Sequence, residues 1–580
     1  MIEATGAQII IKLLEMHGIT TLAGIPGGSI LPLYDELARS GIRHILVRHE
    51  QAGGFLAQGI ARSTGKTAVC LATSGPGAMN LLTAIADARC DSIPLVAITG
   101  QVSSHLIGTD AFQEADTFGL SFPITKHSVM VKSAVELLYA IPAAFEIAAS
   151  GRPGPVLVDV PRDVQLERVR FESWPEPRPI KRRASRFRTD GEDFVRLTAE
   201  AARMLAASSR PVLYAGGGCN SPESGAGIAS LLAAIEIPVV TSLMGIGCVP
   251  ADSANLLGMV GMHGSVAANR AMHDADVVLA AGVRFDDRAT GVIRRFCPDA
   301  KIIHIDIDAA EVNKILSARC AIVADTESAL PVIAEAIAEL HDSPESCRID
   351  RAKWIDGLRK DRDAAREAFR SGAKRAEDAS GLAHPTRFIE SLPELALSAG
   401  LDPNDIIVTT DVGQHQMWTA QWYPVMRPRQ FLTSGSLGTM GFGLPAAIGA
   451  ALANPGKRVV CISGDGSIMM NIQELATLAE LGLDVTVIVL DNGALGMVRQ
   501  QQELLFAKNF SACIFDHSPD LVRIAEGFGI SAVEESSPGW ERIAFGGSGP
   551  RFVHCVIAQD ENVYPFVPAG KANIEAMTGR

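Results

Sequence analysis

The sequence predicts an α/β protein built from three doubly wound parallel-sheet domains. Its 580 residues, 47% hydrophobic and 20% charged, suffice for about three or four domains with large cores. Short apolar runs recur along the chain, and several end in glycine, which is typical of parallel strands covered by helices. Two charged stretches that contain proline separate the blocks, and the pattern at residues 356–376 predicts that the second stretch is partly helical. The predicted order is domain 1–170, linker 171–193, domain 194–340, linker 341–385, domain 386–560 and tail 561–580.

Charge and composition exclude several classes of partner. The net charge of -13 argues against nucleic acid and anionic membranes as partners. The ten cysteines form no C-x-x-C pair, which favours reduced thiols, and no targeting segment precedes the first predicted helix near Thr5. We therefore expect a cytoplasmic protein. Residues 431–456 carry no charge, but six glycines and two prolines interrupt them, so we predict a buried, ligand-lining segment and no membrane span.

The first and third blocks share an internal similarity. At a constant offset of 391 positions, six residues of the first block match identical residues of the third: Gly65, Lys66, Val69, Cys70, Gly75 and Asn80. This pattern predicts two copies of one sheet-and-helix unit. Chance similarity between two strand-to-helix turns is the alternative interpretation.

In the first block, Glu50 follows the apolar strand at residues 45–47 and opens a helix. A glutamate at this position is often only a helix N-terminal residue stabilised by the helix dipole. The functional alternative is a carboxyl group in an apolar pocket, where burial raises the pKa and keeps the proton available for exchange with an aminopyrimidine ring.

The middle block contains three apolar strands at the spacing of a parallel sheet, near residues 211–215, 277–281 and 301–306. The first ends in the triplet Gly216, Gly217 and Gly218, and the second ends at Gly282. A nucleotide could lie across such strand ends. The triplet does not form G-x-G-x-x-G, however, and glycines at strand ends also mark simple turns.

The third block carries the best clue to function. Gly464-Asp465-Gly466 ends one apolar run, and Asn492 follows the next run, 27 positions after Asp465. A strand that stops at Gly-Asp-Gly brings backbone amides close to a phosphate and leaves a carboxylate for Mg²⁺, while Asn492 can supply an amide oxygen to the same ion. Both groups would lie at the carboxyl edge of the sheet, where open α/β folds bind ligands. The alternative is an ordinary tight turn.

With these parts in place, the whole chain resembles the catalytic subunits of acetohydroxyacid synthases, also called acetolactate synthases, which depend on thiamine diphosphate. The resemblance is most specific at residues 108–114, 411–418 and 438–443. Other thiamine enzymes share the glutamate and the Gly-Asp-Gly. Further matching segments are residues 24–28, 48–51, 74–77, 151–155, 282–288 and 464–471.

The resemblance implies a pyrimidine-binding first domain, a central FAD-associated domain and a diphosphate-binding third domain. It implies Mg²⁺ at Asp465, Asn492 and the carbonyl of Ala494, and catalytic roles for Glu50, Phe112, Gln113 and Arg162. Implied contacts with thiamine diphosphate are Pro76, Asn80, Val412, Gly413, Gln414, His415, Gly438, Met440, Gly464, Asp465, Gly466, Ser467, Asn492, Gly496 and Met497. Implied contacts with FAD are Arg152, Gly216, Gly217, Gly218, Ser242, Leu243, His263, Gly264, Arg284, Arg288, Asp306 and Asp325.

Two positions depart from the family pattern. Arg162 stands where members usually have lysine, so the positive charge is kept but the compact ammonium is not. Gln501 stands where many members carry the tryptophan that is associated with preference for 2-oxobutyrate. We therefore expect Gln501 to affect substrate specificity and to weaken the discrimination against pyruvate as second substrate.

The function implied by the resemblance is decarboxylation of pyruvate and condensation of the hydroxyethyl carbanion with a second 2-oxo acid. The product would be 2-acetolactate, or 2-aceto-2-hydroxybutyrate from 2-oxobutyrate, for branched-chain amino acid biosynthesis. The resemblance also implies a homodimer or homotetramer with active sites at the dimer interface, and it allows for a small regulatory subunit. The alternatives are another thiamine diphosphate-dependent carboligase or decarboxylase, and a non-catalytic scaffold. A glyoxylate carboligase would be expected to lack Glu50.

Overall fold

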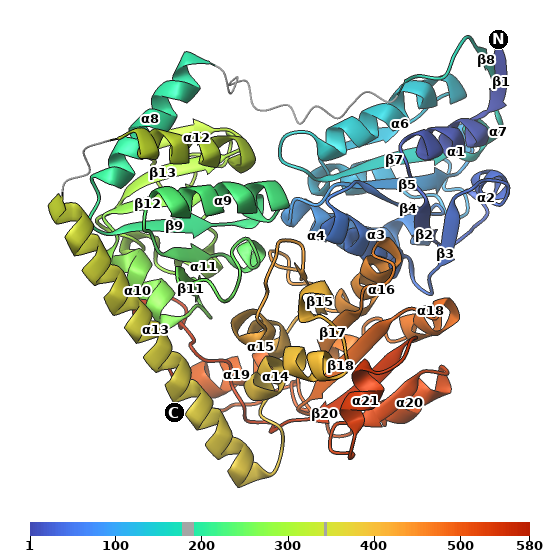
Figure 1. Cartoon of the computed structure of the whole chain (residues 1–580). Coiled ribbons are helices and arrows are strands. Elements are labelled where there is room, and N and C mark those ends of the chain that lie inside the picture. Colours follow the sequence, from blue (N-terminus) through green and yellow to red (C-terminus); the bar gives the residue numbers. More distant parts are fainter. Residues whose placement is uncertain (177–190, 341–344, 580) are drawn as a thin grey trace.

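A computed structural model describes residues 1–176, 191–340 and 345–579. It contains three six-stranded sheets, and helices cover each of them (Figure 1). All strand pairs within these sheets are parallel. The predicted fold class is therefore confirmed.

The N-terminal domain has its central strands buried on both faces, which explains why the strands read as continuous apolar runs. The sheet order is β3 (Arg43–Leu46), β2 (Thr21–Gly24), β4 (Ala68–Ala72), β5 (Leu95–Gln101), β7 (Pro155–Pro161) and β6 (His127–Met130). Its helices are α1 (Gly6–Met16), α2 (Leu31–Leu37), α3 (Glu50–Thr64), α4 (Pro76–Cys90), α5 (Thr117–Ser121), α6 (Ala134–Ala149) and α7 (Arg162–Leu166). A separate antiparallel pair joins β1 (Ile2–Thr5) to β8 (Arg168–Phe171).

The C-terminal domain repeats this topology. Its sheet order is β16 (Phe431–Leu432), β15 (Ile407–Thr410), β17 (Val459–Gly464), β18 (Val485–Asp491), β20 (Arg551–Val556) and β19 (Ser531–Glu534). Its helices are α14 (Pro385–Ser398), α15 (Gln414–Trp422), α16 (Gly443–Ala453), α17 (Asp465–Ile468), α18 (Glu474–Leu481), α19 (Gly496–Leu505), α20 (Leu521–Gly527) and α21 (Trp540–Phe545).

The two end domains therefore share one strand order. In each sheet, the strand that comes first along the chain lies between the strands that come second and third. Two of the matched residues, Val69 and Cys70, lie on β4 and correspond to Val460 and Cys461 on β17; β4 and β17 are the third strand of each sheet along the chain, and the other matched residues flank them. Gly65 and Gly456 both adopt positive φ, at 74° and 85°, a conformation that favours glycine. The internal similarity thus reflects two copies of one unit.

The middle domain has a different order. Its sheet runs β11 (Leu256–Met259), β10 (Val239–Thr241), β9 (Pro211–Ala215), β12 (Val277–Ala281), β13 (Lys301–Asp306) and β14 (Cys320–Val323). Its helices are α8 (Glu192–Ala206), α9 (Pro222–Ala234), α10 (Val266–Asp274), α11 (Asp287–Thr290) and α12 (Thr326–Glu339). Numbered from β9, this is the 3-2-1-4-5-6 order of dinucleotide-binding folds, in which ligands lie at the switch between the adjacent first and fourth strands.

The second predicted linker is a structural element. We predicted that residues 341–385 would be partly helical, and residues 345–380 form one helix, α13 (Glu345–Ser380), along the middle and C-terminal domains (Figure 1). Its buried Arg351 donates to the carbonyls of Leu205, Ala206 and Ser208, where α8 ends. Most of the first predicted linker, at residues 177–190, lies outside the described residues, as do residues 341–344.

The predicted tail packs on the middle domain. The backbone N–H of Val567 donates to the carbonyl of Met262, and Asn573 Nδ2 donates to the carbonyl of Ala289 at 2.7 Å. Most of the segment at residues 431–456 is buried as predicted, since α16 packs along α3, but residues 436–438 and 455–456 are exposed (Figure 1). In the part of the chain that the structure describes, no helix is long and apolar enough to cross a membrane.

Candidate active site

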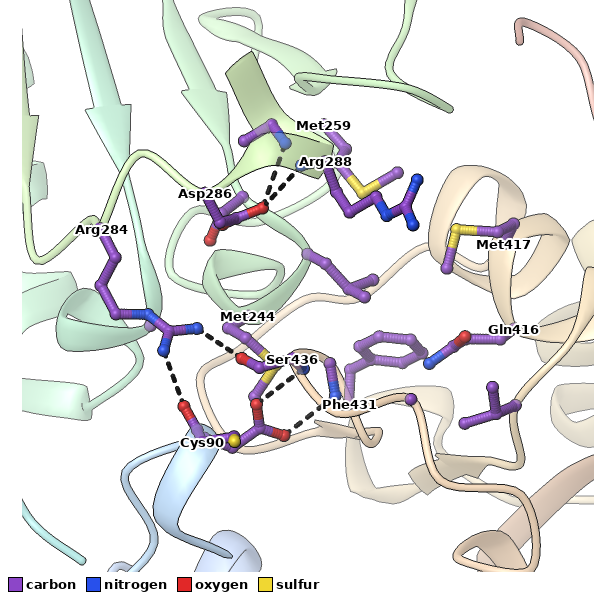
Figure 2. Close-up of a pocket in the computed structure, with 18 of the residues that line it drawn as sticks. Cys90, Met244, Met259, Arg284, Asp286, Arg288, Gln416, Met417, Phe431 and Ser436 are labelled. Atoms are coloured by element: carbon purple, nitrogen blue, oxygen red, sulfur yellow. Dashed lines mark hydrogen bonds between the residues drawn. The ribbon is translucent and has the colours of Figure 1, made fainter. Parts of the chain in front are cut away.

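A cavity of about 1100 Å³ lies where the three domains meet, which is larger than the space that one drug-sized ligand needs. Strand ends of the middle and C-terminal sheets line it, and Figure 2 shows part of its wall. Most of the predicted site residues line this cavity: Arg152, Gly217, Gly218, Ser242, Leu243, His263, Arg284, Arg288, Asp306, Asp325, Val412, Gly413, Gln414, His415, Gly438, Met440, Gly464, Asp465, Gly466, Ser467, Asn492, Ala494, Gly496, Met497 and Gln501.

The two strand ends predicted to hold a metal are neighbours. β17 and β18 pair in parallel, with Gly464 opposite Leu490, so Asp465 and Asn492 leave the sheet at the same edge. Asp465 Oδ2 accepts a hydrogen bond of 3.2 Å from the backbone N–H of Ala494. Asn492 Nδ2 donates to Gln414 Oε1 at 3.0 Å, so its amide oxygen points away from Gln414.

These residues fit a magnesium ion. A carboxylate, an amide oxygen and a backbone carbonyl are the oxygen donors that Mg²⁺ prefers. Burial and the neighbouring Asp491 raise the pKa of Asp465 well above its usual range, and a bound cation would favour its charged form. Among the described residues, no three histidine, cysteine or acidic side chains lie close enough together to hold a metal ion. The ion would therefore also need oxygen atoms from a molecule bound in the cavity.

The residues around the predicted thiamine position come from α15 and from the loop before α16. Ser467 Oγ donates to the carbonyl of Val412 at 2.6 Å, which ties α17 to the start of α15. His415 is buried, and burial lowers the pKa of its ring to about 3. Its Nε2 has no hydrogen-bond partner in the described chain. Gly438 has φ of 68°, a conformation that favours glycine, and a Cβ there would meet only Val412 Cγ1, at 3.9 Å.

Both arginines and carboxylates from the middle domain line the cavity, among them Arg284, Arg288 and Asp306. Arg284 Nη1 donates to the carbonyl of Cys90 at 2.9 Å, and Nη2 donates to Ser436 Oγ, so Arg284 joins all three domains (Figure 2). Burial raises the pKa of Asp306 to about 7. The exposed Gly217 and Gly218 follow β9 at the switch point. This arrangement fits a dinucleotide such as FAD, with arginines for phosphates and Asp306 for a ribose.

Two residues that were predicted as flavin contacts are enclosed by the backbone around them. Gly216 and Gly264 are buried and do not line the cavity. A Cβ on Gly216 would lie 2.1 Å from the carbonyl oxygen of Gly282, so this glycine is required by the close approach of two strand ends. Gly264 is similarly enclosed, because a Cβ there would lie 2.6 Å from the backbone of Gly261.

Apart from Arg152, the predicted site residues of the N-terminal domain lie outside the cavity of their own chain: Glu50, Pro76, Asn80, Phe112, Gln113 and Arg162. Glu50 begins α3, and its Oε2 accepts a hydrogen bond of 2.8 Å from Asn80 Nδ2. The backbone of Gln113 packs on Gly75 beside them. Phe112 is 88% exposed, and Arg162 is exposed at the start of α7. One chain thus presents two separate halves of the predicted site.

Comparison with known proteins assigns the chain to a family. Residues 4–120, 198–333 and 411–555 match the thiamine pyrophosphate enzyme N-terminal TPP binding domain, central domain and C-terminal TPP binding domain. Acetolactate synthase isozyme 1 large subunit of Escherichia coli K12 is 48% identical over 98% of this chain and 97% of its own length. The chain belongs to the acetolactate synthase large-subunit family.

Other members of the acetolactate synthase family give the same result. Acetolactate synthase isozyme 2 large subunit of Escherichia coli K12 is 44% identical over 99% of each chain. A probable acetolactate synthase large subunit of Methanocaldococcus jannaschii is 44% identical over 92% of this chain and 88% of its own length. The resemblance inferred from the motifs is therefore confirmed.

In this acetolactate synthase family member, one hydrogen-bonded group beside the predicted metal ligands was missed in the sequence. His554 Nε2 lies 2.9 Å from Asp491 Oδ2, and His554 Nδ1 lies 2.8 Å from Glu534 Oε2. Although burial opposes it, the two carboxylates raise the pKa of His554, and the trio fixes the end of β18 beside Asn492. The signal was a single histidine inside the otherwise apolar centre of β20.

Proposed function

We propose that the chain is the catalytic subunit of an acetolactate synthase in branched-chain amino acid biosynthesis. It decarboxylates pyruvate and joins the remaining two-carbon fragment to a second 2-oxo acid, giving 2-acetolactate, or 2-aceto-2-hydroxybutyrate from 2-oxobutyrate. The observation that carries this proposal is the 48% identity to an acetolactate synthase large subunit along nearly the whole chain. Identification of the product from pyruvate tests it.

Thiamine diphosphate, when bound, supplies the electron sink that the decarboxylation of a 2-oxo acid requires. Asp465, Asn492 and the carbonyl of Ala494 would hold Mg²⁺ with the diphosphate. Val412 to His415, Gly438 and Met440 would surround the rest of the cofactor. The cavity walls orient the two substrates and exclude water, because protonation of the two-carbon fragment would only release acetaldehyde.

We further propose that each site is completed by a second copy of the chain, in a homodimer or homotetramer. Glu50 lies outside the cavity that Asp465 lines, so within one chain it has no cofactor to act on. On the same domain, Phe112, Phe118 and Phe122 are 88%, 40% and 68% exposed, and large exposed apolar side chains of this kind are found at interfaces. In the dimer, Glu50 would exchange a proton with the aminopyrimidine of the partner's cofactor, and Phe112 and Gln113 would line that site.

Magnesium, FAD and cytoplasmic location are also proposals. The oxygen donors at the ends of β17 and β18 support Mg²⁺, and the strand order of the middle sheet supports FAD. Three arginines that line the cavity, Arg152, Arg284 and Arg288, add to the case for a flavin nucleotide. Since the relatives are named large subunits, a small regulatory subunit is a further expected partner.

Another thiamine-dependent carboligase or decarboxylase is the second candidate within the same chemistry. The Asp465 and Asn492 pair is common to thiamine enzymes and does not separate these reactions. Products formed from pyruvate alone, and from pyruvate with 2-oxobutyrate, do separate them. A scaffold without activity would yield neither carbon dioxide nor a new carbon–carbon bond.

The purified protein should be yellow, because the middle-domain cavity fits FAD. Removal of the flavin should lower acetolactate formation, while the flavin should stay oxidised during turnover, since the reaction transfers no net electrons. Absorbance near the flavin bands before and during turnover measures both. Colourless protein with full activity would contradict the flavin proposal, and the variant Arg284→Gln should retain less FAD than the unaltered chain.

Gln501→Trp should increase the share of 2-aceto-2-hydroxybutyrate when pyruvate and 2-oxobutyrate compete. Gln501 lines the cavity from α19 and is exposed there. One additional methylene gains about 1–3 kcal/mol from an apolar wall, so an indole face could shift selection about tenfold or more. The unaltered chain should show little preference for 2-oxobutyrate.

Product ratios at several mixtures of the two 2-oxo acids measure this effect. Gln501→Leu is a matched variant that adds apolar surface without an aromatic face, and it should give an intermediate ratio. An unchanged ratio in Gln501→Trp, or a strong preference for 2-oxobutyrate in the unaltered chain, would show that residue 501 does not set specificity.

A further inference from the structure

A buried charged cluster of three side chains borders the cavity, and two of them, Arg62 and Asp91, help to line it. It consists of Arg62 on α3, Asp87 on α4 and Asp91, which follows α4; the side chains are 5%, 0% and 0% exposed. Arg62 Nη2 donates to Asp87 Oδ2 at 3.0 Å and to Asp91 Oδ2 at 2.9 Å. One arginine thus faces two carboxylates away from water.

A loop of the C-terminal domain donates hydrogen bonds to the two aspartates and so compensates their remaining negative charge. This loop, residues 433–440, is called the cofactor loop because it carries Gly438 and Met440. Asp91 accepts hydrogen bonds of 2.9 Å from the backbone N–H groups of Gly435 and Ser436. Asp87 Oδ1 accepts from Ser434 Oγ and from Thr439 Oγ1, the latter at 3.1 Å.

Arg62 and Arg284 hold the same loop from two sides. Arg62 Nη1 donates to the carbonyl of Thr433 at 2.9 Å. Arg284 of the middle domain donates to Ser436 Oγ and to the carbonyl of Cys90, next to Asp91 (Figure 2). The cofactor loop therefore has little freedom to move without leaving buried charges unpaired.

The energetics favour this fixed position. An unpaired buried carboxylate is far less stable than one that accepts several hydrogen bonds. Although burial opposes the charge of Asp91, Arg62 and the N–H groups of the cofactor loop hold its pKa below the usual value. Burial raises the pKa of Asp87, whose acceptor sites face the hydroxyls of the loop. Displacement of the loop would remove these donors from both carboxylates.

We infer that Arg62, Asp87 and Asp91 are positioning residues, which hold the cofactor loop in the shape that binds thiamine diphosphate. This inference rests on the proposed function. It gives the N-terminal domain a second role: its α3 and α4 shape the cofactor site of their own chain, while Glu50 serves the site of the partner.

Asp91→Asn tests the inference. The carboxamide keeps the size of the side chain, but its NH₂ group must face an N–H donor, because both oxygens of Asp91 accept from N–H groups. We expect the dissociation constant of thiamine diphosphate to rise about tenfold. Isothermal titration of thiamine diphosphate with Mg²⁺ into the flavin-loaded full chain measures it.

Glu480→Gln is the matched control. Glu480 Oε2 pairs with Arg48 Nη2 at 2.7 Å, which also joins the N-terminal and C-terminal domains, but the side chains are 60% and 33% exposed. Exposed pairs contribute little, so this variant should bind thiamine diphosphate like the unaltered chain.

Thr439→Val is a second variant, for the case that Asp91→Asn does not fold. It removes one hydrogen bond to Asp87 at the edge of the cluster, and we expect about threefold weaker binding with unchanged FAD content and thermal midpoint. Equal binding by the folded variants and the unaltered chain would overturn the positioning role alone. Failure of the unaltered chain to bind thiamine diphosphate would overturn the proposed function as well.

Discussion

Glu50→Gln is expected to lower the turnover of pyruvate by about a hundredfold to ten-thousandfold, because the aminopyrimidine loses the carboxyl group with which it exchanges a proton. Folding and binding of Mg²⁺ with the diphosphate should be kept, since Glu50 lies outside the cavity that contains Asp465. Turnover at saturating cofactor, together with calorimetric binding of thiamine diphosphate, measures the two effects separately.

Glu480→Gln serves as control for this variant, because its partner Arg48 lies two residues before Glu50 and the carboxylate is exposed. This control should keep full turnover. If Glu50→Gln also keeps most of its turnover, Glu50 does not take part in proton exchange. If it instead loses diphosphate binding, its role lies in holding the cofactor.

Mixing two inactive variants should restore activity if each site forms between two chains. Glu50→Ala removes the proton partner and Asp465→Ala removes the metal carboxylate, so each variant alone should be inactive. A mixed dimer contains one site with both residues intact. Random exchange makes about half of the dimers mixed, and one of two sites is then complete, so about a quarter of the unaltered activity should return.

The matched control combines Asp465→Ala with Asn492→Ala. Both residues belong to the same half of the site, so their mixed dimers contain no complete site and should stay inactive. Exchange is verified by mass with differently tagged chains. No recovery in the first mixture after verified exchange would contradict a shared site and would favour sites within one chain.

Local patterns predicted the parts of this protein that depend on short segments. The Gly-Asp-Gly turn and Asn492 were placed correctly at one sheet edge because each follows its own apolar strand, and adjacent parallel strands end together. The internal similarity predicted the shared topology of the end domains. Two of the matched residues, Gly65 and Gly456, both adopt positive φ, so the same local conformation recurs before the third strand of each sheet.

Contacts between distant segments could not be predicted in this way. Asp87 and Asp91 lie four residues apart, which indicates an exposed helix face, yet the cofactor loop buries them from more than 340 positions away. Gly216 looked like a ligand contact but is required by the approach of Gly282. The length of the linker helix α13 was underestimated, because its many charged residues make the narrow apolar stripe that includes Ile355 and Leu358 difficult to recognise in the sequence.

The most direct measurement is the carbon balance of the reaction with pyruvate as sole substrate, thiamine diphosphate, Mg²⁺ and FAD being supplied. Two pyruvate molecules should give one 2-acetolactate and one carbon dioxide, with little acetaldehyde. Acetaldehyde as the main product would show a decarboxylase that does not form the carbon–carbon bond, and the absence of carbon dioxide would show that the chain does not act on pyruvate; either result would contradict acetolactate synthase activity.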